Sequence, residues 1–371
     1  MKIGTDQYNT FDTMTMDCWN DRLYYEGKEF PAGYFAAEIL NFAGDIHDPL
    51  LERITVLTAL VDDLSTAEKS KRHDIAAQLK PLLHDTVSWL YTCPPFCYCE
   101  EQRAYEALEH ALSEERLDRD YEEEEAHLPY LALSFCEPIL RILVAIYNFC
   151  LLIRAFEKKY LRRAKRRNAD AFAKAAHECF DEDDSFLILL EQMPFGGVEE
   201  FFSYPRVITG FKYFQDENDE EKWKTAQRVI CRRAIDFYVF DLMNGLHHGH
   251  APSQCQGCGR YFLTTNGHIP KYCDGVAPQD SRYTCRQYGA MMHQKEQNKQ
   301  HPVYRLFNTR TDTIRKHHQR GKISDDLRRE ALYLAENYRD KALMDNDYAA
   351  DGYARDMELE HIYAEAEKRL K

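Results

Sequence analysis

The sequence predicts a mainly α-helical protein that carries one small α+β zinc module of the treble-clef type. Three observations support this fold class. Glycine and proline are scarce, at 16 and 13 of 371 residues, which favours helices. Apolar residues recur at helical spacing through much of the first half of the chain. Four of the twelve cysteines crowd into the stretch 255–285 around a tight turn.

Composition and charge suggest three segments. We expect a helical N-terminal domain over 1–204, and then a segment over 205–322 in which a strand and a helix lead into the zinc module and its basic helix. A helical C-terminal tail is expected over 323–371. Hydrophobic residues at 44% and charged residues at 30% indicate a folded protein. The start resembles no secretory signal, so the cysteines are expected to be thiols or metal ligands in a reducing cytoplasm.

Helices are predicted in order along the N-terminal domain. One face of the first is formed by Leu50, Ile54, Leu57, Val61 and Leu64. A second helix is indicated by Ile75, Leu79 and Leu82, with a kink or a new start at Pro81. A third is expected over about residues 100–125, ending in the acidic run 122–125.

The most apolar stretch runs from Ile142 to Ile153 and is 12 residues long. A membrane span needs about 20 apolar residues, so a buried core helix is the preferred interpretation. Eight basic residues follow between Arg154 and Arg167. We expect them to pair with the acidic runs 122–125 or 181–184, with nucleic-acid contact as the alternative.

A strand is predicted over 204–214, where Val207, Thr209, Phe211 and Tyr213 alternate. The acidic residues 216–221 then predict the start of a helix, because negative charge suits the positive end of a helix dipole. Its expected apolar positions include Trp223, Ile230, Ala234 and Phe237, and its stop is Asn244-Gly245.

The cysteine stretch has the spacing C-x2-C, then 14 residues, a third cysteine, 11 residues and a fourth. A C-x2-C pair grips a metal from two sides of a tight knuckle. Asn266-Gly267 predicts a hairpin with arms Tyr261–Thr265 and His268–Tyr272, and Thr284 predicts a helix cap directly before the last cysteine. One structural Zn²⁺ held by four thiolates is therefore expected, with the ligands Cys255, Cys258, Cys273 and Cys285.

Two alternatives to this ligand set remain. The four cysteines can be unrelated buried thiols, and His268 is the nearest substitute ligand, with the group His247, His248 and His250 more remote. Near the N-terminal domain's centre, Cys93, Cys97 and Cys99 form a second metal candidate, although two prolines there favour a packed turn.

The order CQGCGRYF, KYC and TCR, followed by a basic helix, resembles the CGNR-type zinc fingers of bacterial proteins and related uncharacterised bacterial proteins. The resemblance covers about residues 255–322. It implies the same four zinc ligands and a transcription-regulatory, DNA-binding role. Here Arg286-Gln287-Tyr288 replaces the Gly-Asn-Arg that follows the last cysteine in that family, which weakens the functional part of the likeness.

Charge distribution supports a nucleic-acid interface in the same region. The net charge is −14, yet residues 255–322 hold 12 Lys/Arg against 4 Asp/Glu. Cationic groups hold phosphates and amides read base edges. The candidate contacts are Arg286, Gln287, Gln294, Lys295, Asn298, Lys299, Arg305, Arg310, Arg315, Lys316, Arg320 and Lys322.

Two other function classes stay open. A zinc-stabilised module that docks a protein partner fits the same sequence, because treble clefs serve both uses. An enzyme is less favoured, since no phosphate-binding, dinucleotide, zinc-protease or serine-hydrolase motif occurs. After Lys322, Ser324 is expected to cap a helix whose stripe is Leu327, Ala331, Leu334 and Tyr338. That tail is expected to pack on the helical body or to mediate self-association.

Overall fold

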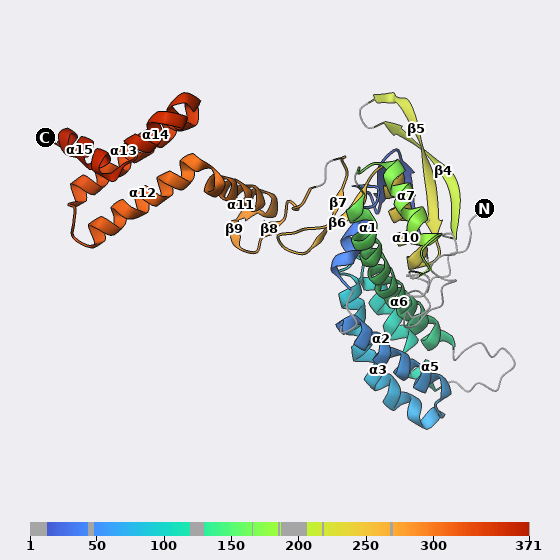
Figure 1. Cartoon of the computed structure of the whole chain (residues 1–371). Helices are drawn as coiled ribbons and strands as arrows, with labels where there is room; N and C mark the ends of the chain where they lie inside the picture. Colours follow the sequence, from blue (N-terminus) through green and yellow to red (C-terminus); the bar gives the residue numbers. More distant parts are fainter. Residues whose placement is uncertain are drawn as a thin grey trace. The chain divides into compact units, whose positions relative to one another are not determined.

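The computed structural model describes residues 13–43, 48–118, 130–164, 166–184, 186, 206–216, 219–267 and 270–370. It is mainly helical with small sheets, and the predicted fold class is thereby confirmed. The chain divides into two compact units, Met1–Lys271 and Tyr272–Lys371. Figure 1 labels many of the elements of both.

The first unit contains a five-stranded antiparallel sheet of order β3-β2-β1-β5-β4. Its strands are β1 (Met14–Trp19), β2 (Arg22–Tyr25), β3 (Lys28–Pro31), β4 (Val207–Asp216) and β5 (Asp219–Cys231). Strands β1–β3 were not predicted, because each shows only two or three alternating apolar residues. Residues 14–31 and 207–231 were expected in different segments of the chain, yet β1 pairs with β5.

The helix predicted from residue 216 was wrong in its first half. Residues 219–231 form β5, and α10 (Ala234–His247) begins only afterwards. The physical reason is that side chains in this segment alternate between two faces, as in a strand. Val229 and Cys231 lie on the buried face. The same face continues into solvent at Trp223, Thr225 and Gln227. The strand predicted at 204–214 is present as β4 from Val207, and residues 204–205 lie outside the described residues.

Helices α2 (Pro49–Thr66), α3 (Lys69–Leu90) and α6 (Tyr130–Lys159) pack side by side in the first unit (Figure 1). The five residues predicted for the inner face of α2 are its buried ones. Pro81 lies inside α3, which continues through it. The predicted helix over 100–125 is shorter, as α4 (Gln102–Ala111) and α5 (Glu114–Leu117), and the acidic run 122–125 lies outside the described residues.

Helix α6 contains the most apolar stretch of the sequence. By length and composition, Phe135–Arg163 is able to cross a membrane, with a mean hydropathy of 2.0, but 61% of its most apolar window is buried inside the protein. The side chains of Leu143, Ile146 and Phe149 are wholly buried in the core of the first unit. These contacts agree with the predicted core helix.

Further helices in the described part of the first unit complete this core. They are α1 (Tyr34–Glu38), α7 (Ala169–Phe180) and the short 3-10 turns η1 (Ile39–Asn41), η2 (Phe96–Tyr98) and η3 (Leu161–Arg163). A small two-stranded sheet, β6 (Ala251–Gln254) and β7 (Tyr261–Thr264), follows α10.

The start of α1 is hydrogen-bonded directly to α10. The buried carboxylate of Asp241 accepts hydrogen bonds from the backbone N–H of Gly33 (2.8 Å) and of Ala36 (2.9 Å). Burial raises the pKa of Asp241 to about 7, although these backbone donors oppose the rise. The backbones of Gly33 and Gly245 approach so closely that Gly245 has no room for a side chain, and Gly33 adopts a left-handed φ of 86° that favours glycine.

The second unit is helical apart from one short hairpin. Strands β8 (Val276–Ala277) and β9 (Asp280–Thr284) precede α11 (Cys285–Gln300) and α12 (Pro302–Gln319). Next come α13 (Asp325–Met344), the π-helical turn η4 (Tyr348–Gly352), α14 (Tyr353–Asp356) and α15 (Leu359–Leu370). Ser324 caps α13 as predicted, and the expected stripe of α13 packs against α12.

We predict that Gly245→Ala lowers the free energy of unfolding by about 1–3 kcal/mol, because overpacking forces a backbone shift. The new Cβ would lie 2.7 Å from Gly33 Cα. Urea melts of both proteins, followed by circular dichroism, measure the difference. Gly210→Ala is the matched control, since its Cβ would meet no atom within 4 Å. Equal melts for the two variants would contradict the close contact.

Candidate metal centre

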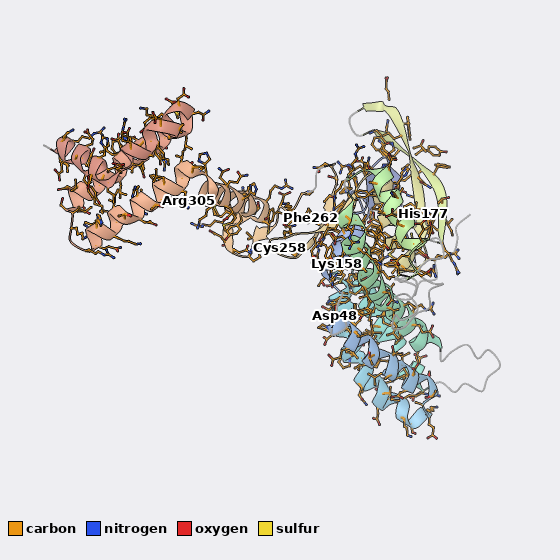
Figure 2. All side chains as sticks on the ribbon, in the orientation of Figure 1. Asp48, Lys158, His177, Cys258, Phe262 and Arg305 are labelled. Atoms are coloured by element: carbon orange, nitrogen blue, oxygen red, sulfur yellow. The ribbon has the colours of Figure 1, made fainter. Side chains whose placement is uncertain are left out.

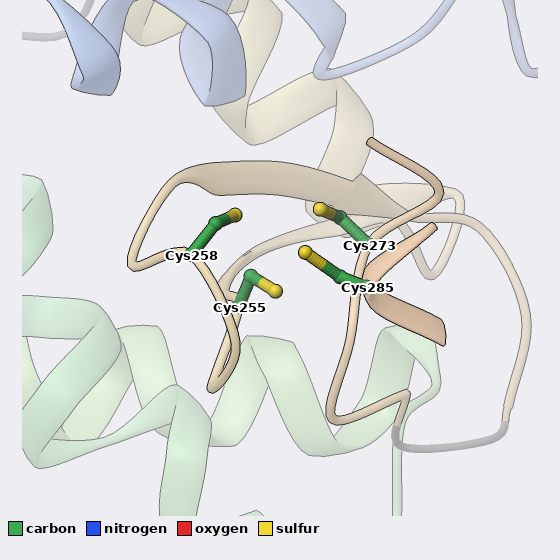
Figure 3. A group of neighbouring side chains, drawn as sticks. All are labelled: Cys255, Cys258, Cys273 and Cys285. Atoms are coloured by element: carbon green, nitrogen blue, oxygen red, sulfur yellow. The ribbon is translucent and has the colours of Figure 1, made fainter. Parts of the chain in front are cut away.

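The structure brings the four predicted cysteines together. Their sulfur atoms all lie within 4.8 Å of one another, and Figure 3 shows the four side chains pointing toward a common centre. Cys255, Cys273 and Cys285 are buried, and Cys258 is half-buried. Such a cluster of thiols is suited to bind one metal ion.

Cys255 and Cys258 lie in the turn that joins β6 to β7. The N–H of Cys255 donates to Arg260 O (2.8 Å), and the N–H of Gly259 donates to Cys255 O (2.9 Å). Gly259 has a φ of 76°, a left-handed conformation that favours glycine. The tight turn directs both thiols to the same side, as the C-x2-C spacing indicates.

Residues far away in the sequence hold this hairpin in place. Asn41 makes two hydrogen bonds with the backbone of Tyr261, donating to its oxygen (3.1 Å) and accepting from its N–H (2.7 Å). Arg167 donates to the Thr264 hydroxyl at 3.0 Å, and Arg162 donates to the Gln254 side chain at 3.2 Å. The knuckle is therefore fixed to the core of the first unit.

These contacts also explain the basic flank after α6. Arg162 pairs with the buried carboxylate of Glu157 at 3.0 Å, and Lys159 pairs with Asp183, which lies in the acidic run 181–184. Arg167 is buried among the contacts given above. Lys159 thus pairs with one of the two acidic runs that the preferred interpretation named, whereas Arg162 pairs with Glu157 outside them and Lys158, Arg163 and Arg166 are exposed.

Cys273 and Cys285 are positioned by the start of α11. Thr284 caps this helix: its hydroxyl accepts from the N–H of Gln287, and the Gln287 side chain accepts from the N–H of Thr284. The N–H of Cys285 donates to Gly275 O (2.7 Å), and that of Arg286 donates to Cys273 O (3.0 Å). The predicted cap is confirmed.

The predicted hairpin around Asn266-Gly267 is wrong. Strand β7 pairs with β6, which precedes it in the sequence, and residues 270–272 form no strand. His268 and Ile269, the start of the predicted second arm, lie outside the described residues. The hairpin that the structure does contain joins β6 to β7, which pair antiparallel, from Ala251 with Thr264 to Gln254 with Tyr261. The knuckle with Cys255 and Cys258 is the turn of this hairpin.

Two contacts at the site were not expected from the sequence. Arg286 forms an ion pair with Asp274 at 3.1 Å, so the residues that follow Cys273 and Cys285 bind each other. Gly289 lies against the ring of Tyr272, where an added Cβ would come within 2.4 Å of a ring carbon. The signal for the first was the charge pair in KYCD and TCR. The contact between Gly289 and Tyr272 had no signal in the sequence, because a single glycine in a helix is not distinctive.

The donor set fits zinc. Four thiolates around Zn²⁺ lie about 2.3 Å from the metal, which places tetrahedral sulfurs about 3.8 Å apart. The observed upper limit of 4.8 Å is close enough for small side-chain rotations to reach that geometry. All twelve cysteines are free thiols in the structure.

The other cysteines form no comparable group. Among the described residues, the cluster at 255–285 is the one set of at least three metal-ligating side chains that converge. Cys93, Cys97 and Cys99 do not converge in this way, and Cys99 lies 3.2 Å from the Tyr25 hydroxyl instead. Burial raises the pKa of Cys93 to about 12, which keeps its thiol protonated.

The candidate nucleic-acid residues are distributed over α11, α12 and the loop that follows. Gln294, Lys295, Arg305, Lys316, Arg320 and Lys322 are exposed, and Figure 2 labels Arg305 on α12. Three further candidates make polar contacts within the chain: Arg286 with Asp274, Gln287 in the helix cap and Arg315 with Asp312. Arg310 is half-buried, and the side chains of Asn298 and Lys299 lie outside the described residues.

Residues 203–369 match the model of a protein family described as "Family of unknown function (DUF6076)". The four-cysteine cluster lies inside the matched region, together with β4, β5 and the helices up to α15. No curated protein and no solved structure matches the chain. No match to a named protein therefore supports the resemblance to CGNR-type zinc fingers, which stays a prediction.

We predict that Cys258→Ser and Cys273→Ser each lose the bound metal, because a serine hydroxyl does not replace a thiolate as a zinc ligand. Elemental analysis of the purified wild-type protein should find about one zinc per chain, and each variant far less than half of that. Cys97→Ser is the control, since Cys97 is exposed and outside the cluster. A wild-type protein without zinc, prepared in its presence, would contradict the assignment.

We also predict that Gly289→Val weakens zinc affinity about tenfold or more, because the new side chain displaces Tyr272 beside Cys273. Competition with a chromophoric chelator measures the affinity. Ala290→Val in the same helix is the control, since Ala290 is exposed. Helix propensity favours valine over glycine but not over alanine, so a larger loss at position 289 would come from the Tyr272 contact. Similar affinities in both variants would show that the Tyr272 contact does not support the site.

Proposed function

We propose that the protein is a structural-zinc protein whose α11–α12 segment binds duplex DNA. In this proposal one Zn²⁺ is held by Cys255, Cys258, Cys273 and Cys285. The observation that carries it is the start of α11: the metal ligand Cys285 opens a helix whose residues 290–297 are all exposed, within a strongly basic segment.

The role of zinc in this proposal is structural. Four protein thiolates fill the tetrahedral coordination of Zn²⁺, so no position is left for a substrate or a reactive water. What the metal supplies is folding free energy for the knuckle and the helix start. An enzyme would need a site elsewhere, and the sequence offers no motif for one.

The exposure of α11 supports a role in binding. A helix in a folded protein normally buries an apolar face, because its own hydrogen bonds stabilise it only marginally. The stretch Ala290–Gln297 buries no side chain. A helix of this width fits the major groove of B-DNA, which is about 12 Å wide.

Charge supports nucleic acid as the partner. Residues 286–322 contain nine Lys/Arg and two acidic residues, and residues 323–371 contain eight against thirteen. The basic side chains of Lys295, Arg305 and Lys316 are exposed. Since the rest of the chain is acidic, DNA would be repelled everywhere except along this segment, and binding would be oriented.

A second candidate function is docking of a protein partner. Met291 and Met292 on α11 are 42% and 43% exposed. Exposed methionines are typical of adaptable protein-binding surfaces and contribute nothing to phosphate contacts.

The free thiols also favour a reducing compartment such as the cytoplasm for either function.

We predict that the protein retards duplex DNA at about 50 mM salt and that the affinity falls steeply with salt. In the variant Lys295→Ala with Arg305→Ala, the slope of log affinity against log salt should flatten by about two, because each lost phosphate contact removes about 0.9. Gln294→Ala should mainly change sequence preference. Fluorescence anisotropy over a salt series measures both.

Arg355→Ala is the control for that experiment, since Arg355 is an exposed cation outside residues 286–322. Its slope should equal that of the wild type. If zinc-loaded protein retards neither duplex nor single-stranded DNA at about 50 mM salt, docking of a protein is the better account.

A further inference from the structure

Among the described residues, strand β4 forms an edge of the five-stranded sheet, with β5 as its neighbour there. It is ten residues long and contains no proline, whereas the opposite edge, β3, has four residues and ends in Pro31. Figure 1 shows β4 as the outer strand of a long hairpin. Alternate residues of an edge strand direct their backbone N–H and C=O groups away from the sheet, which makes such a strand a template for pairing with another strand.

The usual protection of such an edge is weak here. A lysine at a sheet edge prevents pairing when its charge is free. The Lys212 ammonium instead lies 3.0 Å from the Asp17 carboxylate, which also binds Arg228. Burial alone would raise the pKa of Asp17, but hydrogen bonds and charge from Arg228 and Lys212 hold it below its usual value. The ionised Asp17 carboxylate therefore offsets part of the Lys212 charge within the sheet.

One face of the hairpin is apolar and exposed. Phe211 (71% exposed), Tyr213 (68%) and Trp223 (67%) lie on this same face. Their exposed neighbours on this face are uncharged: Thr209, Gln215, Thr225 and Gln227. The cations of the hairpin, Lys212 and Arg228 among them, are on the other face, so the aromatic face lacks the phosphate contacts of a nucleic-acid platform.

The residues of β4 are self-complementary in one register. When two copies of β4 pair antiparallel around a two-fold axis, the two longest overlaps centre on Phe211 or on Lys212. Centring on Lys212 places two lysines directly opposite each other, which is unfavourable. Centring on Phe211 places Lys212 opposite Gly210, Tyr213 opposite Thr209 and Phe214 opposite Ile208.

The register centred on Phe211 brings favourable side-chain pairs together at the axis and on either side of it. The two Phe211 rings meet at the axis, and the aromatic and β-branched pairs on either side are among those that stabilise antiparallel sheets. A Cβ at Gly210 would meet no atom within 4 Å, so the lysine of the other copy has room.

We propose that the protein forms a homodimer in which β4 of one copy pairs antiparallel with β4 of a second copy, centred on Phe211, to make a continuous ten-stranded sheet. The interface is isologous, as closed two-fold dimers require. It lies wholly within the first unit and does not depend on the zinc site or on DNA binding.

Sedimentation equilibrium of the full-length, zinc-loaded protein tests the proposal. The wild type should show a monomer–dimer equilibrium, and Phe211→Asp should raise the dimer dissociation constant about tenfold or more, because two carboxylates would meet at the axis. Tyr213→Asp is the matched control: its exposure is similar, but it faces Thr209, so its effect should be clearly smaller.

A charge pair at Gly210 tests the register. Gly210→Glu should tighten the dimer about fivefold, since it faces Lys212 of the second copy, and Gly210→Lys should weaken it by a similar factor. Circular dichroism and zinc content verify that each variant is folded. A wild type that stays monomeric at about 100 μM, or a dimer equally affected by Phe211→Asp and Tyr213→Asp, would overturn the proposal. Binding of a single-stranded oligonucleotide by a monomer through Phe211 would overturn it in favour of a stacking platform.

Discussion

The convergence of four cysteine sulfurs is the constraint on which the C-terminal part of this protein depends. Cys255 and Cys258 reach the cluster because a tight turn with a left-handed Gly259 directs both thiols to one side. Cys285 reaches it because Thr284 fixes the first turn of α11. Without a metal, four buried or half-buried thiols at this separation contribute only modest packing. With one, they become the strongest local source of folding free energy.

Polar side chains supply the rigidity that such a cluster needs. Asn41 binds the backbone of β7, and Arg167 binds Thr264 at the end of the same strand. Within the second unit, Asp274 and Arg286 connect the residues next to two of the cysteines. A ligand set that looks local in the sequence is thus supported by a wider group of hydrogen bonds, which orient the thiols.

The cysteine positions and helix faces were predictable because they depend on local patterns. The stripe of α2 and the cap at Thr284 follow from spacing and from one side chain's reach. Strands β1–β3 and β5 were missed or misread because a strand is defined by its partner, and β1 pairs with a segment more than 200 residues away. The hairpin at Asn266-Gly267 failed for the same reason, since β7 finds a better-matched partner in β6. Long-range anchors such as Asn41 leave no local trace.

The anchoring of the knuckle has a consequence for the order of events during synthesis. Asn41, Arg162 and Arg167 leave the ribosome well before Cys255, and N-terminal regions generally fold first as the chain grows. The surface that receives the β6–β7 hairpin can therefore form before any of the four ligands has emerged. Cys285 comes last, so coordination closes only after the scaffold for the first two thiols exists. Metal capture then follows the folding of this scaffold and does not nucleate it, and the helices after Cys285 are added to a site that is already complete.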